Sequence, residues 1–135
     1  KIYGNTANQG GGVHSVESIL KIAGAEITGN TATGANGFGG GLYVQGGNAE
    51  VTGAEITGNT AVTGGGLFAG HKTAKTIVKM TSGKLYGNTA TNHSADVYVN
   101  ELTALTLPNA SSTAQTSLAG SGTAAESMLG ARIMW

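Results

Sequence analysis

The sequence predicts an all-β protein, a right-handed parallel β-helix of about four turns of 25–29 residues, with three short strands per turn and an irregular C-terminal cap. Short blocks of residues recur at a nearly constant interval. Each repeat holds three pieces in which apolar and polar residues alternate, and Gly, Asn and Thr separate these pieces. A single repeat of this kind cannot bury its apolar side, so successive repeats must stack and pair their equivalent strands in parallel.

The first recurring block has the pattern apolar-x-Gly-Asn-Thr-Ala, and its successive Asn residues are 25, 29 and 29 residues apart. We expect these Asn side chains to form a structural ladder at a corner, because stacked amides can bond to their counterparts above and below. Asn also tolerates the left-handed backbone conformation that a corner needs. The predicted ladder consists of Asn5, Asn30, Asn59 and Asn88, with Thr6, Thr31, Thr60 and Thr89 stacked beside it.

The second recurring block is rich in Gly and leads into an apolar strand. In its second copy we expect Leu42 and Val44 to face the interior and Tyr43 to face outwards, because side chains alternate along a strand. Gly40 and Gly41 come just before this strand, where a corner with positive φ or a bulge is expected. The copies of this block are residues 10–13, 39–44, 64–69 and the degenerate 94–99, and a third block occupies residues 22–26, 51–55 and 80–84.

Two insertions lengthen individual turns, and function tends to be placed where a repeat is interrupted. Residues 70–75 extend the third turn and contain His71, Lys72 and Lys75, which suggest either a small patch for an anionic ligand or a solvated turn. Residues 33–38 extend the second turn as an uncharged loop ending in Phe38. This Phe is expected either to form a contact point for a ligand or to fold back over the core.

The carboxylates of the repeats do not predict catalysis. Glu26 and Glu55 occupy equivalent outward positions on adjacent turns, but Lys84 follows at the next position, which is typical of a surface ladder rather than an acid pair for glycoside hydrolysis. The sequence has one Asp, one Arg and no Cys, and its three His residues show no metal-ligand spacing. We therefore expect a protein that is not an enzyme and has no metal or other cofactor.

Composition narrows the class of protein further. The chain has 135 residues, of which 24 are Gly and 10% are charged, and its formal net charge is zero, so nucleic acid is not an expected partner. No apolar run approaches the roughly 20 residues of a membrane-spanning helix, so membrane insertion is not expected either. The low charge and the absence of Cys favour an extracellular or bacterial cell-surface location.

The two ends of the chain are expected to differ. Residues 1–107 carry the repeats, whereas residues 108–135 form a tail rich in Ser, Thr and Ala that either caps the solenoid or links it to another element. A capping-box pattern at residues 123–126 predicts a short helix or a hydrophobic flap. The first repeat starts in mid-pattern at Lys1, as in a fragment, and an uncapped end would favour end-to-end association of copies.

The paired blocks resemble the repeats of polymorphic outer-membrane proteins and of related β-helical adhesins and autotransporter passenger domains. The resemblance covers residues 1–107 and rests on pairs such as Gly40-Gly41-Leu42 with Ile27-Thr28-Gly29-Asn30. Ile or Leu replaces the Phe that is usual in the Asn block, and Ala95-Asp96 replaces the fourth Gly-Gly pair. The resemblance implies surface display and an adhesive or stalk role, with a host surface protein or a glycan as partner.

The function expected from the sequence is thus a non-catalytic β-helical segment of a bacterial surface or secreted protein, acting as an adhesin or stalk. Two alternatives stay open at this point. One is a carbohydrate-binding or depolymerase-type β-helix similar to a phage tailspike, and the other is a subunit of a self-assembling extracellular fibre.

Overall fold

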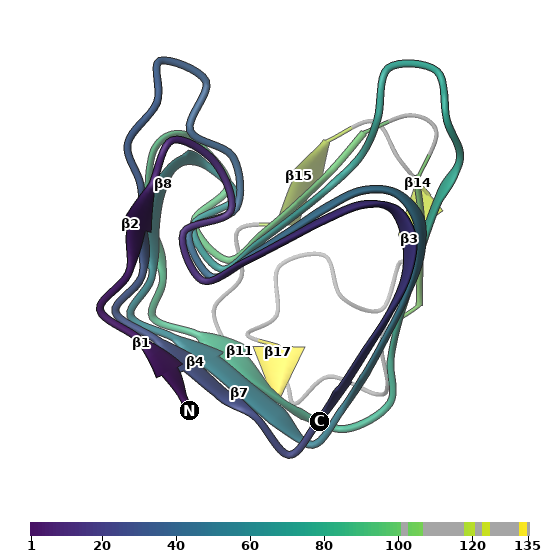
Figure 1. The fold of residues 1–135 in the computed structure, drawn as a ribbon, viewed down its shortest axis with the longest axis horizontal. Coiled ribbons are helices and arrows are strands. Elements are labelled where there is room, and N and C mark those ends of the chain that lie inside the picture. The colour runs from purple at the N-terminus through teal and green to yellow at the C-terminus, as the bar shows by residue number, and fades with distance from the viewer. Residues whose placement is uncertain (101–102, 107–117, 121–122, 125–132, 135) are drawn as a thin grey trace.

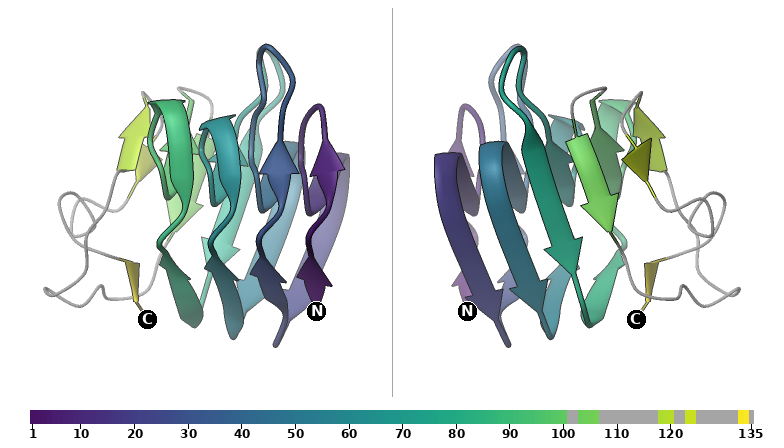
Figure 2. Two further views of the ribbon diagram at one scale, coloured as in Figure 1. Left: turned by 90° about the vertical axis from the view of Figure 1, so that its left-hand side faces the viewer. Right: turned by 90° about the vertical axis from the view of Figure 1, so that its right-hand side faces the viewer.

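The structure, a computed structural model, is a parallel β-solenoid of about four turns (Figure 1). It describes residues 1–100, 103–106, 118–120, 123–124 and 133–134. Equivalent strands of successive turns lie side by side in three sheets, as Figure 2 shows, and no described residue is helical. The predicted parallel solenoid is therefore confirmed.

The first sheet contains the strand that precedes each corner Asn. Its register places Ile2, Ile27, Ile56 and Leu85 opposite one another, so one apolar side chain per turn enters the interior at the same position. A last strand joins this sheet antiparallel, pairing with residues 84 and 85. The strands are β1 (Ile2–Tyr3), β4 (Glu26–Thr28), β7 (Ala54–Thr57), β11 (Gly83–Tyr86) and β17 (Ile133–Met134).

The second sheet follows directly after the corner, and its strands begin at the Thr of each repeat. Thr6 pairs with Thr31, Thr31 with Thr60, and Thr60 with Thr89, which confirms the predicted stacking of these residues. The strands are β2 (Thr6–Ala7), β5 (Thr31–Ala32), β8 (Thr60–Thr63) and β12 (Thr89–His93).

The third sheet changes along the solenoid. In the first two turns a single strand of 11 residues bends around a corner, but in the third turn the insertion at residues 70–75 divides it into two strands. Figure 1 shows this insertion and the loop at residues 33–38 projecting from the same side of the solenoid. The strands are β3 (Val13–Ala23), β6 (Leu42–Thr52), β9 (Leu67–Ala69), β10 (Thr76–Met80), β13 (Val97–Val99), β14 (Thr103–Thr106), β15 (Leu118–Gly120) and β16 (Thr123–Ala124).

A narrow apolar core runs along the axis of the solenoid. Leu42 and Val44 are fully buried within it, as their alternation with Tyr43 predicts. Burying a Leu or Ile side chain stabilises the folded state by about 1.5–3 kcal/mol. The largest fully buried side chains are Ile27, Leu42, Ile56, Leu67, Met80 and Leu85. Because each turn contributes the same few positions, the core depends on stacking rather than on any single turn.

The corners differ from the prediction in one respect. The left-handed residue is the Gly before each Asn, with φ of 64° at Gly29 and 65° at Gly58, and none of the four ladder Asn residues has positive φ. Gly supplies this conformation at no steric cost, which leaves Asn in ordinary backbone geometry. In the second block the positive φ lies at Gly39, whereas a Cβ on Gly41 would lie 2.8 Å from Asn59 Nδ2. Position 41 therefore needs Gly because the Asn59 side chain lies too close for a Cβ, and not because its backbone has a positive φ.

The end of the chain continues the sheets. Strand β15 pairs in parallel with β13, and β16 pairs in parallel with β14, so these strands extend the third sheet beyond the fourth turn. Thr123 and Ala124 are in a strand and not in the first turn of a helix; the remainder of the predicted capping-box segment lies outside the described residues. Within the described residues there is also no helix long and apolar enough to cross a membrane.

Candidate functional site

The Asn corner is a ladder whose two inner rungs, Asn30 and Asn59, are buried and have the same set of bonds. Asn59 Oδ1 accepts bonds from the backbone N–H and the Nδ2 of Asn30, both at 3.0 Å, and Asn59 Nδ2 donates to Asn88 Oδ1 at 2.9 Å. The same Nδ2 donates to Ile27 O at 2.9 Å. Asn30 and Asn59 are fully buried, so the ladder satisfies backbone groups that would otherwise be unpaired at the corner.

Asp96 ends this ladder. Its Oδ1 accepts from the Asn88 backbone N–H at 3.1 Å and from Asn88 Nδ2 at 2.9 Å, which are the two bonds that the next Asn would accept. Asp96 occupies the position of Gly66 in the turn before, where a Cβ would lie 2.6 Å from Asn88 Nδ2. The degenerate fourth Gly block thus supplies a terminal acceptor, a role that the sequence pattern did not reveal.

The two stacked carboxylates of the first sheet form a surface ladder. Glu26 and Glu55 are paired in register, and Lys84 follows, as predicted. Lys1 Nζ lies 2.7 Å from a carboxylate oxygen of Glu26, and the Tyr86 hydroxyl donates to Glu55 at 3.0 Å. Each acid has its own partner, an arrangement that offers no free carboxylate pair for acid–base chemistry.

An aromatic ladder lies on the outer face of the third sheet. The register of β3, β6, β9 and β13 places His14, Tyr43, Phe68 and Tyr98 opposite one another. The His14 and Tyr43 rings stack with centroids 4.5 Å apart, and Phe68 stacks on Tyr98 at 4.9 Å. These residues alternate with the core residues of the same strands, so strand geometry alone directs their rings outwards.

The loop at residues 33–38 places Phe38 against this aromatic ladder. The Phe38 ring stacks on Phe68 with centroids 4.3 Å apart and meets Tyr43 edge-on at 5.8 Å. Backbone bonds hold the loop, since Gly34 N donates to Asn8 O at 3.0 Å and Val62 N donates to Gly37 O at 2.9 Å. Phe38 therefore folds back, but onto outward-facing rings and not over the core.

The loop at residues 70–75 is held by His71. Its Nδ1 accepts bonds from the backbone N–H groups of Thr73 and Ala74, at 3.1 and 2.9 Å, and its Nε2 lies 3.6 Å from a carboxylate oxygen of Glu17. The Nδ2 of Asn100 donates to His71 O at 2.7 Å. The two backbone bonds to Nδ1 and the approach of Glu17 to Nε2 fix the orientation of the imidazole ring within the loop.

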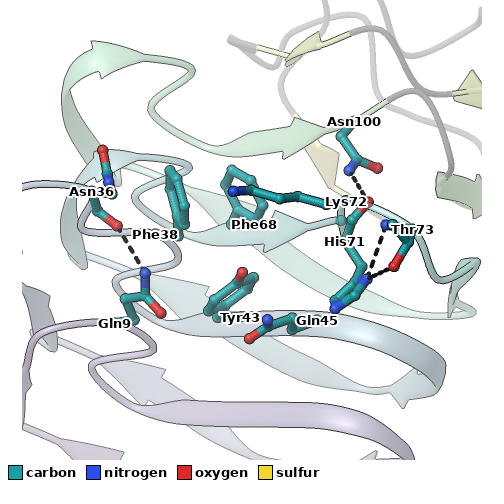
Figure 3. A pocket seen from close by; sticks show the side chains of 11 residues that line it. Gln9, Asn36, Phe38, Tyr43, Gln45, Phe68, His71, Lys72, Thr73 and Asn100 are labelled. Atoms are coloured by element: carbon teal, nitrogen blue, oxygen red, sulfur yellow. Dashed lines mark hydrogen bonds between the residues drawn. The ribbon is translucent and has the colours of Figure 1, made fainter.

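The two loops flank a groove of about 620 Å³ above the aromatic ladder, shown in Figure 3. The Tyr43 hydroxyl lies in the groove, and burial raises its pKa above the ordinary value of 10.0, so it remains a hydrogen-bond donor at neutral pH. Lys72 extends into the groove from its loop. The other lining residues are Gln9, Asn36, Phe38, Gln45, Phe68, Gly70, His71, Thr73 and Asn100.

Three of the four predicted ligand contacts meet in this groove. Phe38, His71 and Lys72 line it, whereas Lys75, on the same loop as Lys72, does not. Sequence reasoning missed Tyr43 and Gln45 as lining residues. The alternation that directs Tyr43 outwards was visible in the sequence, but the loops that enclose it were not.

Within the described part of the chain, no group of three or more His, Asp or Glu side chains is placed to hold a metal ion. No family model, no curated protein and no solved structure matches the chain.

Proposed function

We propose that this chain is a non-catalytic, adhesive binding module of a bacterial cell-surface or secreted protein, with the solenoid as a rigid scaffold and the groove as the ligand site. One observation carries the proposal. The two insertions in an otherwise regular repeat rise on the same side and enclose the outward aromatic ladder. Binding sites are commonly built from loops that a rigid scaffold positions.

The distribution of carboxylates supports binding rather than catalysis. Three acids of the described repeats contact partners away from the groove: Glu26 contacts Lys1, Glu50 contacts Lys21 and Glu55 contacts Tyr86. A fourth, Glu17, lies 3.6 Å from His71, which lines the groove. None of the described acids lines the groove. Hydrolysis of a glycosidic bond needs two carboxyl groups facing the bond, so the depolymerase alternative is less well supported.

The C-terminal end of the solenoid argues against a fibre made by stacking on that end. Asp96 terminates the Asn ladder with an acceptor, and strands β15 and β16 pair with β13 and β14. A second copy stacked there would find no amide that continues the ladder, and the edges of β13 and β14 are already paired. The absence of Cys supports an extracytoplasmic location, since the chain has no thiol to oxidise.

The proposal is tested by displaying the chain on beads and measuring adhesion to epithelial cells. We expect adhesion to fall at least several-fold with Phe38→Ala, because this ring forms part of the groove wall. Tyr3→Ala is the matched control, since Tyr3 is an aromatic residue of the first sheet with 65% of its surface exposed and lies outside the groove. Equal adhesion of the two variants and the unaltered chain would contradict a role for the groove.

A second measurement addresses catalysis. Reducing-end assays on acidic and neutral polysaccharides are expected to show no turnover by the unaltered chain. Turnover that is lost in Glu26→Gln or Glu55→Gln would overturn the non-catalytic assignment.

A further inference from the structure

We propose that the groove binds an acidic oligosaccharide and that Lys72 recognises its carboxylate or sulfate groups. This inference rests on the proposed function and names the ligand class for the same site. It follows from the charge of the groove, the unused hydrogen-bonding groups in it, its extent and the pairing of the strands beneath it.

The groove carries the positive charge of Lys72, and none of the described acids lines it. Lys72 is exposed and extends into the groove, and no carboxylate of the described residues lies within ion-pair distance of it. His71, the other basic side chain that lines the groove, is engaged through Nδ1 by two backbone N–H groups and through Nε2 by Glu17, so Lys72 is the cation that is available to a ligand. A cleft lined by charge of one sign attracts the opposite charge, so the ligand is expected to be anionic.

The remaining polar groups suit a ligand rich in hydroxyls. Gln9 donates through Nε2 to Asn36 O, which leaves Gln9 Oε1 without a partner among the described residues. The Oε1 of Gln45 accepts a hydrogen bond from His14 Nε2, which leaves the Nε2 of Gln45 without a partner among the described residues. The Asn36 amide and the Tyr43 hydroxyl also have no hydrogen-bond partner in the described part of the chain. The groove thus offers hydrogen-bond donors and acceptors side by side. A sugar hydroxyl can use both, because it donates one hydrogen bond and accepts others.

Apolar surface lies beside these polar groups. Phe38 and Tyr98 are partly exposed at the two ends of the stack that encloses Phe68. Concave sites for small ligands typically combine such apolar surface with a few polar groups that fix orientation. The C–H groups of a sugar ring match the exposed part of Phe38, while its hydroxyls match the amides.

The hollow extends beyond one sugar unit. A second hollow shares Gln9 and Asn36 with the groove, and a third shares Phe38, Phe68 and Asn100 with it. The three hollows therefore adjoin one another across several turns of the solenoid. An oligosaccharide fits this extent better than a monosaccharide.

The sheet beneath the groove disfavours a peptide. A peptide often binds by adding a strand to an unpaired sheet edge. The floor of the groove is instead a sheet face, in which β6 pairs with β3 and β9, and β9 pairs with β6 and β13. Recognition must come from side chains, and an acidic peptide is the alternative that the experiment has to separate.

The experiment uses the chain on an array of oligosaccharides bearing uronate, sialate or sulfate groups, beside neutral oligosaccharides of equal length. The acidic compound retained best is then titrated by calorimetry together with its carboxyl-reduced or desulfated form. We expect the acidic form to bind about tenfold more tightly, the scale of one charge-assisted hydrogen bond, and the preference to shrink as salt rises.

Lys72→Gln is expected to abolish this preference, while Lys75→Gln, the matched control on the same loop, retains it. Both residues are exposed, so neither change should alter the melting temperature. An unchanged preference in Lys72→Gln, or retention of no acidic oligosaccharide, would overturn the ligand assignment. If bead adhesion still depended on Phe38 in that case, the proposed function would stand and only the ligand class would fall.

Binding of a poly-glutamate peptide in place of any oligosaccharide, lost in Phe38→Ala, would replace the glycan with an acidic peptide. Retention of no ligand, together with bead adhesion indifferent to Phe38, would overturn both proposals.

Discussion

The Asn corner and the aromatic groove are both ladders of stacked side chains, yet they differ in what surrounds them. At the corner, Asn59 is fully buried and its amide is satisfied by neighbouring turns. In the groove, two loops from different turns enclose Tyr43 and Lys72, and several amide groups there have no partner among the described residues. Strict repetition therefore satisfies the buried polar groups of the corner, whereas interruption of the repeat creates the groove.

The largest effect is expected from breaking the buried ladder. Asn59→Ala removes a side chain that serves Asn30, Ile27 and Asn88, and leaves buried donors and acceptors unpaired. We expect it to lower the free energy of unfolding by about 4 kcal/mol, measured by urea denaturation. Asn5→Ala, at the exposed end of the ladder, should cost less than about 1 kcal/mol. Equal losses would show that burial does not distinguish the rungs.

A smaller effect is expected at the end of the ladder. Asp96→Ala removes the acceptor for two bonds from Asn88 and should cost about 2 kcal/mol. Asp96→Asn keeps an acceptor oxygen at the same place and should lose clearly less. The two variants are compared by thermal and urea unfolding; a larger loss in Asp96→Asn than in Asp96→Ala would contradict the terminator role.

In the groove, a change to the loop is expected to act locally. His71→Ala removes the acceptor for the N–H groups of Thr73 and Ala74, which should cost about 1 kcal/mol. Amide hydrogen exchange should accelerate at Thr73 and Ala74 while the Asn corner keeps its protection. Lys75→Ala, on the same loop, is the control. Faster exchange at the corner as well would show that the loop and the ladder are not independent.

The smallest effect is expected at alkaline pH. Burial raises the pKa of Tyr43 above 10.0 in the folded state, so between pH 10.0 and that raised pKa the folded chain holds a proton that the unfolded chain has lost. This contribution to stability is complete below pH 10.0 and is lost as the pH rises through the folded-state pKa. Tyr43→Phe should flatten the decline measured by urea unfolding above pH 10. A decline of equal slope in both proteins would exclude Tyr43 as its source.

Individual residues show how far prediction from sequence reached. Repetition of Asn30 and Asn59 at a constant interval predicted the ladder, because equivalent residues of stacked turns must lie one above another. The same logic wrongly gave Asn the left-handed backbone, which Gly29 and Gly58 supply instead. In the sequence, Asp96 is only a departure from the Gly block. Only the structure shows that its carboxylate accepts the backbone and side-chain hydrogen bonds of Asn88 and so ends the Asn ladder.

The sequence by itself determined the parallel solenoid, the length of its turns and the alternation of Leu42, Tyr43 and Val44, because these follow from periodicity and strand geometry. The tertiary structure alone decided that Phe38 and His71, 33 residues apart in the sequence, line one groove over Tyr43. Loop conformation depends on bonds between turns, such as those from Val62 to Gly37 and from Asn100 to His71. The repeat pattern of the sequence does not predict such bonds, because they join residues at non-equivalent positions of different turns. The candidate site therefore became visible only in the structure.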